Sequence, residues 1–278
     1  MTNPLVTTDW LADHLDDPNI VLVDASWYMP ATGRKGYSEY LESHLPGAVF
    51  FGIDDIADKT TTLPHMLPTP EAFAAAVGKL GIADTDTIVV YDEAGVFAAP
   101  RVWWTFRAMG AKDVRVLDGG GPKWRAEARP TAAGEEQPAP RTFAAHYQPA
   151  LVQDFDTVLE LTHSKARTIV DARPGDRFRG EAPEPRPGLA SGHIPGSLSV
   201  PASEVTANGQ LKSAEELRAL FAKAGVDVTR PIVTSCGSGV TASTVALALA
   251  IAGAKDVAVY DGSWTEWGGR ADSPVERG

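Results

Sequence analysis

The chain has 278 residues, of which 44% are hydrophobic, and its formal net charge is -11 at pH 7. This length corresponds to two domains of ordinary size, each long enough to bury its own core. The acidic balance argues against nucleic acid or an anionic membrane as a partner, because such binding relies on Lys and Arg neutralising phosphates.

The alternation of predicted strands and helices along the chain indicates an α/β fold with mostly parallel sheets. In the first half we expect strands at residues 21–23, 87–91 and 114–117, and helices over 69–80 and 98–109. In the second half we expect a helix over 213–224, a strand at 232–233 and a helix over 241–252. Pro70 near the start of one helix and the Ser213 to Glu216 pattern of a capping box mark two of the predicted beginnings.

The second half of the chain repeats the first at a spacing of 143 to 149 residues. Residues 20–26 correspond to 167–173, 44–48 to 193–197 and 110–114 to 253–257, and Asp118, Gly119 and Trp124 recur as Asp261, Gly262 and Trp267. Repeats of this kind indicate two copies of one fold. We therefore predict a first domain over 1–128, a Pro-rich linker over 129–149 and a second domain over 150–278.

Cys236 is the one cysteine of the chain, and it stands between the predicted strand and helix of the second copy. Gly237 and Gly239 follow it and allow tight turns. A helix N-terminus favours an anion, which here is the thiolate of a nucleophile. A lone cysteine is more often a small buried hydrophobe, but the Gly-Ser-Gly loop favours the nucleophile. Asp92 occupies the corresponding place in the first copy, which therefore lacks a nucleophile.

With a single cysteine the chain cannot form an internal disulfide, and residues 1–5 lack the basic and apolar regions of a signal peptide. No apolar stretch reaches the length of a transmembrane helix. We therefore expect a cytoplasmic protein with no membrane partner.

These features resemble the two-domain rhodanese-like sulfurtransferases, and the loop after Cys236 is similar to that of the 3-mercaptopyruvate type. The thiosulfate type carries basic side chains in this loop. The resemblance implies two tandem rhodanese-like domains, the second catalytic, and a persulfide on Cys236 that passes sulfur to a thiol or to cyanide. Thioredoxin or a low-molecular-weight thiol is the expected acceptor. Backbone N–H groups of the loop would hold the anionic sulfur; the loop residues concerned are Gly237, Gly239, Val240 and Thr241.

Two arginines match the substrate-binding arginines of the resembled family, Arg177 and Arg186, with Arg179 as a weaker candidate. A guanidinium group matches the carboxylate of a donor such as 3-mercaptopyruvate. The alternative is that these side chains lie on a solvated loop and pair with Glu181 and Glu184.

The resemblance also implies a Ser-His-Asp group that polarises the donor, formed by Ser238, His65 and Asp54. Asp54 would fix the tautomer of His65, which would relay a proton through the Ser238 hydroxyl. Gly52 and Pro64 depart from the family pattern next to these residues. The alternative for His65 is an ordinary surface histidine.

Other functions fit the sequence less well. A thiosulfate:cyanide sulfurtransferase would need more positive charge beside Cys236, and a cysteine phosphatase would need arginine where Ala242 stands. A non-catalytic sulfur-binding or scaffolding module would not need the cysteine and the arginines. His44 and His193 occur at the same place in both copies, so we expect them to be structural. No Cys/His spacing or phosphate motif indicates a metal or another cofactor.

Overall fold

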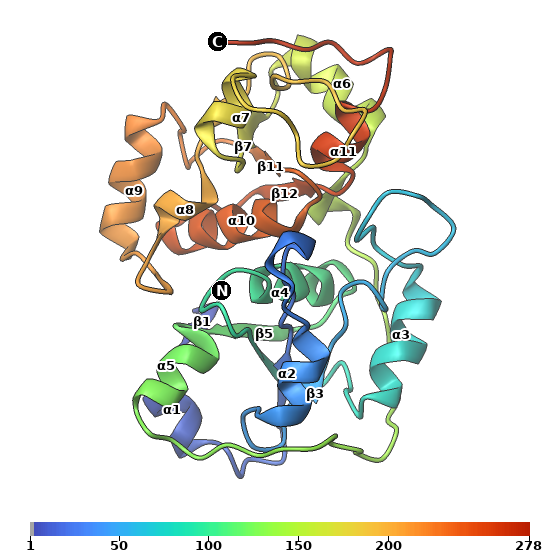
Figure 1. Ribbon diagram of the computed structural model, residues 1–278, viewed down its shortest axis with the longest axis vertical. Coiled ribbons are helices and arrows are strands. Elements are labelled where there is room, and N and C mark those ends of the chain that lie inside the picture. Colours follow the sequence, from blue (N-terminus) through green and yellow to red (C-terminus); the bar gives the residue numbers. More distant parts are fainter. Residues whose placement is uncertain (1–2) are drawn as a thin grey trace. The chain divides into compact units, whose positions relative to one another are not determined.

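The computed structural model describes residues 3–278, so Met1 and Thr2, part of the segment inspected for a signal peptide, lie outside it. The described chain divides into two compact units (Figure 1). The first unit comprises residues up to Lys59, Leu67–Gln148 and Asn208–Leu211. The second comprises Thr60–Met66, Pro149–Ala207 and Lys212–Gly278. Each unit contains one parallel sheet of five strands among its described residues.

The sheet of the first unit has the strand order β1-β5-β4-β2-β3, and every pairing is parallel. Its strands are β1 (Leu5–Val6), β2 (Ile20–Asp24), β3 (Val49–Phe50), β4 (Thr87–Tyr91) and β5 (Asp113–Leu117). Its helices are α1 (Thr8–Asp13), the 3-10 helix η1 (Pro30–Thr32), α2 (Gly36–Glu42), α3 (Pro70–Lys79), α4 (Ala99–Ala108) and α5 (Gly120–Ala126).

The sheet of the second unit has the matching order β6-β12-β11-β7-β8, again with parallel pairings. Its strands are β6 (Val152–Gln153), β7 (Thr168–Asp171), β8 (Leu198–Ser199), β11 (Ile232–Ser235) and β12 (Val257–Tyr260). Its helices are η2 (Pro149–Leu151), α6 (Phe155–Ser164), α7 (Gly175–Arg179), α8 (Ala202–Val205), α9 (Ala214–Lys223), α10 (Val240–Ala252) and α11 (Ser263–Trp267). A short hairpin of β9 (Thr206–Ala207) and β10 (Gln210–Leu211) precedes α9. The two predicted copies of an α/β fold are thus confirmed.

The helix boundaries follow from local capping. Thr69 caps α3 by accepting from the Ala72 amide, and Ser213 and Glu216 form the predicted capping box of α9. Each predicted helix agrees with the structure to within about one residue at each end, the difference expected from fraying.

Helices cover both faces of the second sheet (Figure 1). Helices α6 and α11 pack on one face, where Trp264 and Trp267 join a core that includes Val233 and Tyr260. Helix α10 lies on the other face, against β11 and β12, and most of its side chains are buried. This all-round burial explains why α10 has an apolar sequence on every side. The strand β11 and the helix α10 are joined by residues 236–239, the predicted catalytic loop.

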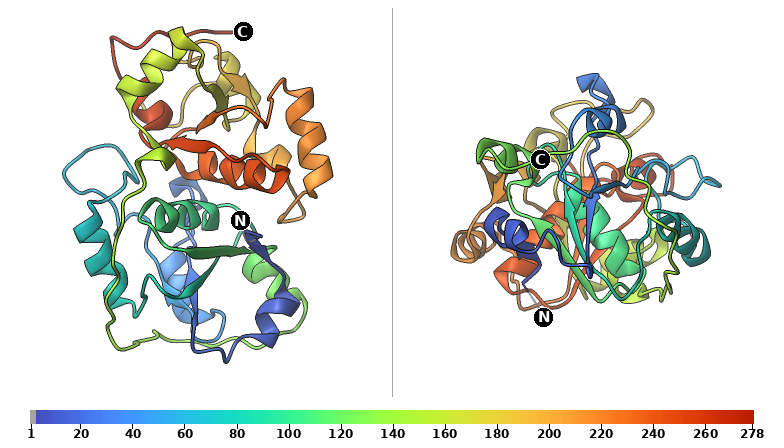
Figure 2. Two further views of the ribbon diagram at one scale, coloured as in Figure 1. Left: turned by 180° about the vertical axis from the view of Figure 1, so that it is seen from behind. Right: turned by 90° about the horizontal axis from the view of Figure 1, so that it is seen from below.

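The Pro-rich stretch from 129 to 148 runs as an extended segment along the first unit (Figure 2). Its backbone amides donate to that unit, from Arg141 to Gly78 at 2.8 Å and from His146 to Met109 at 2.8 Å. Its many prolines fit a segment that forms neither a helix nor a strand. None of the helices in the described part of the chain is long and apolar enough to cross a membrane.

Candidate active site

Cys236 lies directly after β11, at the N-terminal end of α10, as the sequence predicts. The residue is 2% exposed, and its Sγ accepts a hydrogen bond from the Gly239 amide at 3.2 Å. Gly239 has φ of +82°, the left-handed region that favours glycine, whereas Gly237 does not have a positive φ. The expectation of a glycine turn therefore holds for Gly239 alone. The loop presents the sulfur to the helix N-terminus, where an anion is stabilised.

The first turn of α11 contacts the backbone of this loop. The Cys236 amide donates to the Ser263 hydroxyl at 3.2 Å. The Trp264 amide donates to the Cys236 carbonyl at 2.9 Å, and the Thr265 amide donates to the Gly237 carbonyl at 2.8 Å. The Thr265 hydroxyl also donates to the Gly237 carbonyl, at 2.6 Å. The backbone of Cys236 and Gly237 is therefore held from α11 as well as from β11 and α10.

Arg177 is the predicted substrate arginine that lies beside the loop. Its Nη2 is 3.4 Å from the place that a Cβ on Gly237 would take. Its Nη2 donates to Glu184 in a short contact, and its Nε donates to the other carboxylate oxygen of Glu184 at 3.2 Å. Arg177 therefore lies beside Gly237 and pairs with Glu184, one of the two partners that the solvated-loop alternative names. Its role in substrate binding stays a prediction. Arg179 is half exposed and pairs with Glu181, as the solvated-loop alternative expects.

A buried charge network behind Arg177 was not found from the sequence. Arg173 is 1% exposed at its side chain, donates to Asp171 at 2.7 Å and donates to Glu184 at 2.8 Å. Its guanidinium also lies over the Trp264 ring at 4.1 Å. Glu184, 3% exposed at its side chain, thus joins a buried arginine to the arginine at the loop. A single sequence carries no signal that tells a buried arginine from an exposed one.

The structure places the remaining predicted residues as follows. Ser238 is buried within the loop, and Val240 and Thr241 open α10. Arg186 is half-buried and forms no ion pair with any residue in the described part of the chain. His65 is 6% exposed, has φ of +64° and belongs to the short segment Thr60–Met66 of the second unit, the unit of Cys236.

Asp54 belongs to the first unit, where the Trp27 indole donates to its carboxylate at 2.8 Å. His44 and His193 make the same two kinds of contact in their respective units, which supports the predicted structural role. Each ring Nδ1 lies 2.8 Å from a backbone carbonyl of the preceding helix, and each ring stacks on an aromatic side chain there.

In the first unit the counterpart of Cys236 is a buried carboxylate. Asp92 is 1% exposed, and one of its oxygens accepts from the amides of Phe97, Ala98 and Ala99 at 2.7 to 2.8 Å. The other oxygen accepts from the Ala94 amide at 2.9 Å. This loop therefore surrounds a negative group with backbone N–H donors, the property predicted for the loop of Cys236.

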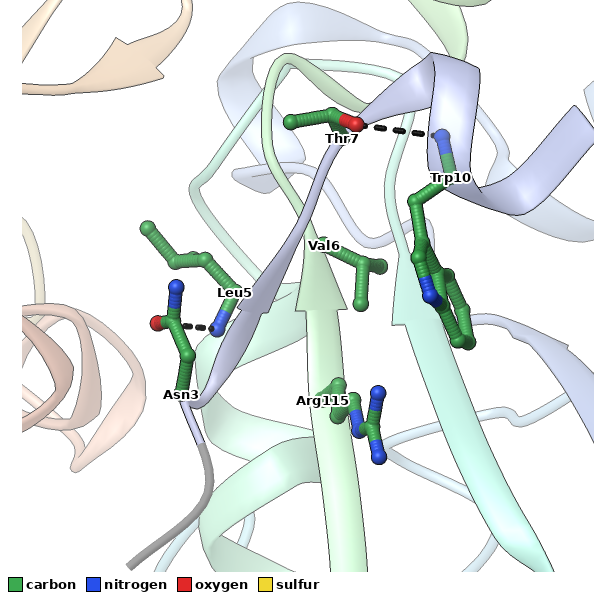
Figure 3. Close-up of a pocket in the computed structure, with 6 residues that line it drawn as sticks. All are labelled: Asn3, Leu5, Val6, Thr7, Trp10 and Arg115. Carbon is green, nitrogen blue, oxygen red and sulfur yellow. Dashed lines mark hydrogen bonds between the residues drawn. The ribbon is translucent and has the colours of Figure 1, made fainter.

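A separate cavity of about 360 Å³ lies in the first unit, beside β1 and β5 (Figure 3). Its lining residues are Asn3, Leu5, Val6, Thr7, Trp10 and Arg115. The Thr7 hydroxyl accepts from the Trp10 amide at 3.1 Å, and Arg115 is held by Asp113 at 2.6 Å. None of the predicted site residues lines this cavity, so it is not the candidate active site.

Comparison with known proteins identifies the family of this chain. The family model of the rhodanese-like domain matches the chain twice, at residues 7–127 and 154–270. The 3-mercaptopyruvate sulfurtransferase of Escherichia coli K12 is 46% identical over 276 residues, which cover 99% of this chain and 98% of that protein. The thiosulfate sulfurtransferase of Bos taurus is 45% identical, over 96% of this chain and 92% of that protein.

Among solved structures, that of the 3-mercaptopyruvate sulfotransferase SseA from Escherichia coli superimposes with a TM-score of 0.87 at 43% identity. The match covers 95% of this chain and 99% of that one. The two matches to the domain model, the full-length relatives and the shared fold lead to one conclusion: the chain belongs to the rhodanese family of two-domain sulfurtransferases.

Proposed function

We propose that this chain transfers sulfur from 3-mercaptopyruvate to a thiol or cyanide acceptor through a persulfide on Cys236, and releases pyruvate. The position of Cys236 is the main support for the proposal, because its Sγ lies at the N-terminus of α10 and accepts a hydrogen bond from the Gly239 amide. The Escherichia coli relatives, which are 3-mercaptopyruvate sulfurtransferases, support this donor. A cytoplasmic location and a small thiol or thioredoxin as acceptor belong to the same proposal.

The reaction balances with the groups at this site. The Cys236 thiolate attacks the sulfur of 3-mercaptopyruvate, the carbon–sulfur bond breaks, and its electron pair leaves with the carbon as the enolate of pyruvate. Protonation of that carbon gives pyruvate and leaves the persulfide, whose charge the loop amides stabilise. Because the sequence has a single cysteine, the sulfur leaves when an external thiolate or cyanide attacks the outer sulfur atom.

The proposed roles of the other residues follow from the charge of the donor. Arg177 and Arg186 bind its carboxylate, and Arg177 is held beside Gly237 by Glu184. Ser238, His65 and Asp54 polarise the ketone and move the proton. Ser238 and His65 both belong to the second unit, which supports this assignment, and Asp54 completes it by analogy with the resembled family.

The choice of donor is tested by comparing pyruvate release from 3-mercaptopyruvate with thiocyanate formation from thiosulfate and cyanide. Gly237 and Ser238 add no positive charge after the cysteine, so we expect a large preference for 3-mercaptopyruvate in the wild type. We also expect Ser238→Ala to lower turnover of 3-mercaptopyruvate more than that of thiosulfate. The bovine relative makes thiosulfate the alternative donor. A wild type that prefers thiosulfate, with equal losses for both donors in the variant, would favour that alternative.

Arg186 gives a second test, because its guanidinium has no ion-pair partner among the described residues. We expect Arg186→Ala to raise the KM for 3-mercaptopyruvate about tenfold to a hundredfold, the equivalent of about 1.5–3 kcal/mol for a lost charged hydrogen bond. Its effect on kcat should be smaller. Arg230→Ala removes an exposed arginine of the same unit and serves as the control. An unchanged KM in Arg186→Ala would remove this residue from the substrate site.

A further inference from the structure

The contacts between α11 and the catalytic loop point to two further residues that act on the nucleophile. We propose that Ser263 and Thr265 are positioning residues that fix the backbone of Cys236 and Gly237, a proposal that rests on the function given above. The Ser263 hydroxyl accepts from the Cys236 amide at 3.2 Å and donates to the Tyr260 carbonyl at 2.8 Å. The Thr265 amide and hydroxyl both donate to the Gly237 carbonyl.

The first unit provides an internal comparison, because it has the same turn without a nucleophile. The repeat that aligns Asp118 and Gly119 with Asp261 and Gly262 continues with Gly120 opposite Ser263 and Pro122 opposite Thr265. Glycine has no hydroxyl, and proline has neither a hydroxyl nor a backbone N–H. The copy without a cysteine therefore lacks all three of the donors and acceptors that Ser263 and Thr265 provide.

The backbone contact between these positions is common to both copies. In the first unit the Gly121 amide donates to the Asp92 carbonyl at 3.1 Å, as Trp264 donates to Cys236 in the second. A Cβ added to Gly120 would lie 2.3 Å from the Asp92 carbonyl oxygen, so the first copy leaves no room for a side chain there. The side chains at 263 and 265 are thus specific to the catalytic copy, whereas the shared contact belongs to the fold.

Ser263 adopts a backbone conformation that disfavours serine. Ser263 is 0% exposed and has φ of +49°, in the region where glycine is favoured and other residues are strained. Such strain persists at functional sites when the surrounding contacts require it. Glycine would relieve the strain at this position, as Gly120 does in the first copy with φ of +55°. What serine adds is the hydroxyl that binds the Cys236 amide.

These contacts bear on catalysis through geometry. The Cys236 amide is buried, and without Ser263 it would need another acceptor. A shift of the backbone that supplies one would turn Sγ away from the Gly239 amide and from the attacking position. Displacements of about 1 Å in a reacting group cost up to about a hundredfold in rate. The charged pairs around the loop, Arg177–Glu184 and Arg173–Asp171, do not involve Ser263 or Thr265.

Three variants test the proposal: Ser263→Gly, Ser263→Ala and Thr265→Val. The measurements are the rate of the pyruvate burst at saturating 3-mercaptopyruvate, the KM, and the rate of Cys236 alkylation by iodoacetamide, which needs no sulfur donor. We expect Ser263→Gly and Ser263→Ala each to slow the burst about tenfold or more with little change in KM. Thr265→Val should cost less, about threefold, because its amide still donates to Gly237.

The unfolding temperatures of the two Ser263 variants separate the effect of losing the hydroxyl from the effect of the backbone strain. Ser263→Ala keeps the strained φ, so we expect it to unfold about 2–4 °C below Ser263→Gly. The control is Ser197→Ala, which removes another buried hydroxyl of the second unit, one that donates to Ile194 at 2.6 Å. The proposal is overturned if Ser263→Gly matches the wild type or the control in burst and alkylation rates, or if its KM alone changes. Absence of any pyruvate release by the wild type would refute the donor and leave the alkylation rates to decide the role of Ser263.

Discussion

Cys236→Ser is expected to lose pyruvate release from 3-mercaptopyruvate by at least about a thousandfold, because a serine hydroxyl cannot form a persulfide and is a weak nucleophile. Cys236 is buried at the N-terminus of α10, and serine differs from it in one atom. The fold should therefore be unaffected. The activity is measured from the pyruvate formed in the presence of a thiol acceptor.

Mass spectrometry gives an independent reading of the same step. After exposure to 3-mercaptopyruvate without an acceptor, the wild type should gain the mass of one sulfur atom, and Cys236→Ser should gain none. Equal thermal unfolding of the two proteins serves as the control for folding. A variant that retains more than about a tenth of the wild-type activity would mean that another group accepts the sulfur.

Arg173→Met is expected to have the largest effect on stability, a loss of about 3–5 kcal/mol in the free energy of unfolding. Arg173 is 1% exposed at its side chain and is the buried partner of both Asp171 and Glu184. Methionine fills a similar space but leaves the charge of Asp171 without its cation. The loss is measured from urea unfolding curves of the variant and the wild type at neutral pH.

The first unit indicates how this loss depends on pH. Asp24 is the counterpart of Asp171, but Ser26 stands opposite Arg173, and burial raises the pKa of Asp24 to about 6. A carboxylate whose pKa is higher in the folded state than in the unfolded state stabilises the fold at low pH. That stabilisation is lost as pH rises through the folded pKa. We therefore expect Arg173→Met to recover part of its stability as pH falls from 7.5 towards 5.

Arg179→Met is the matched control, because Arg179 is exposed and pairs with the exposed Glu181. An exposed ion pair contributes little to stability, so its unfolding midpoint should stay close to that of the wild type. If the two variants unfold at the same urea concentration, the buried network does not stabilise the fold.

Much of the fold could be predicted because the chain contains the same pattern twice. The repeat identified two copies, and the strand–loop–helix pattern around Cys236 placed this residue at the start of α10. Capping residues such as Thr69 and Ser213 located helix beginnings, because their hydrogen bonds are made within one turn. Such features depend on neighbours in the sequence, which is why a single sequence reveals them.

The parts that sequence did not reveal depend on contacts between distant residues. Arg173 and Glu184 form a buried pair 11 residues apart, and nothing in their neighbours distinguishes them from the exposed pair of Arg179 and Glu181. The inclusion of residues 60–66 in the second unit is likewise a property of the folded chain. For Ser263 a signal was present, since the repeat places it opposite Gly120, but its meaning depends on the strained φ that the structure shows.

The carboxylate of Asp92, enclosed by four backbone amides, limits which residues can stand at this position. An apolar side chain at position 92 would leave those amides buried without an acceptor, which destabilises the fold. Folding alone therefore requires a hydrogen-bond acceptor at position 92. An aspartate in this loop stabilises the first unit whether or not that unit takes part in catalysis.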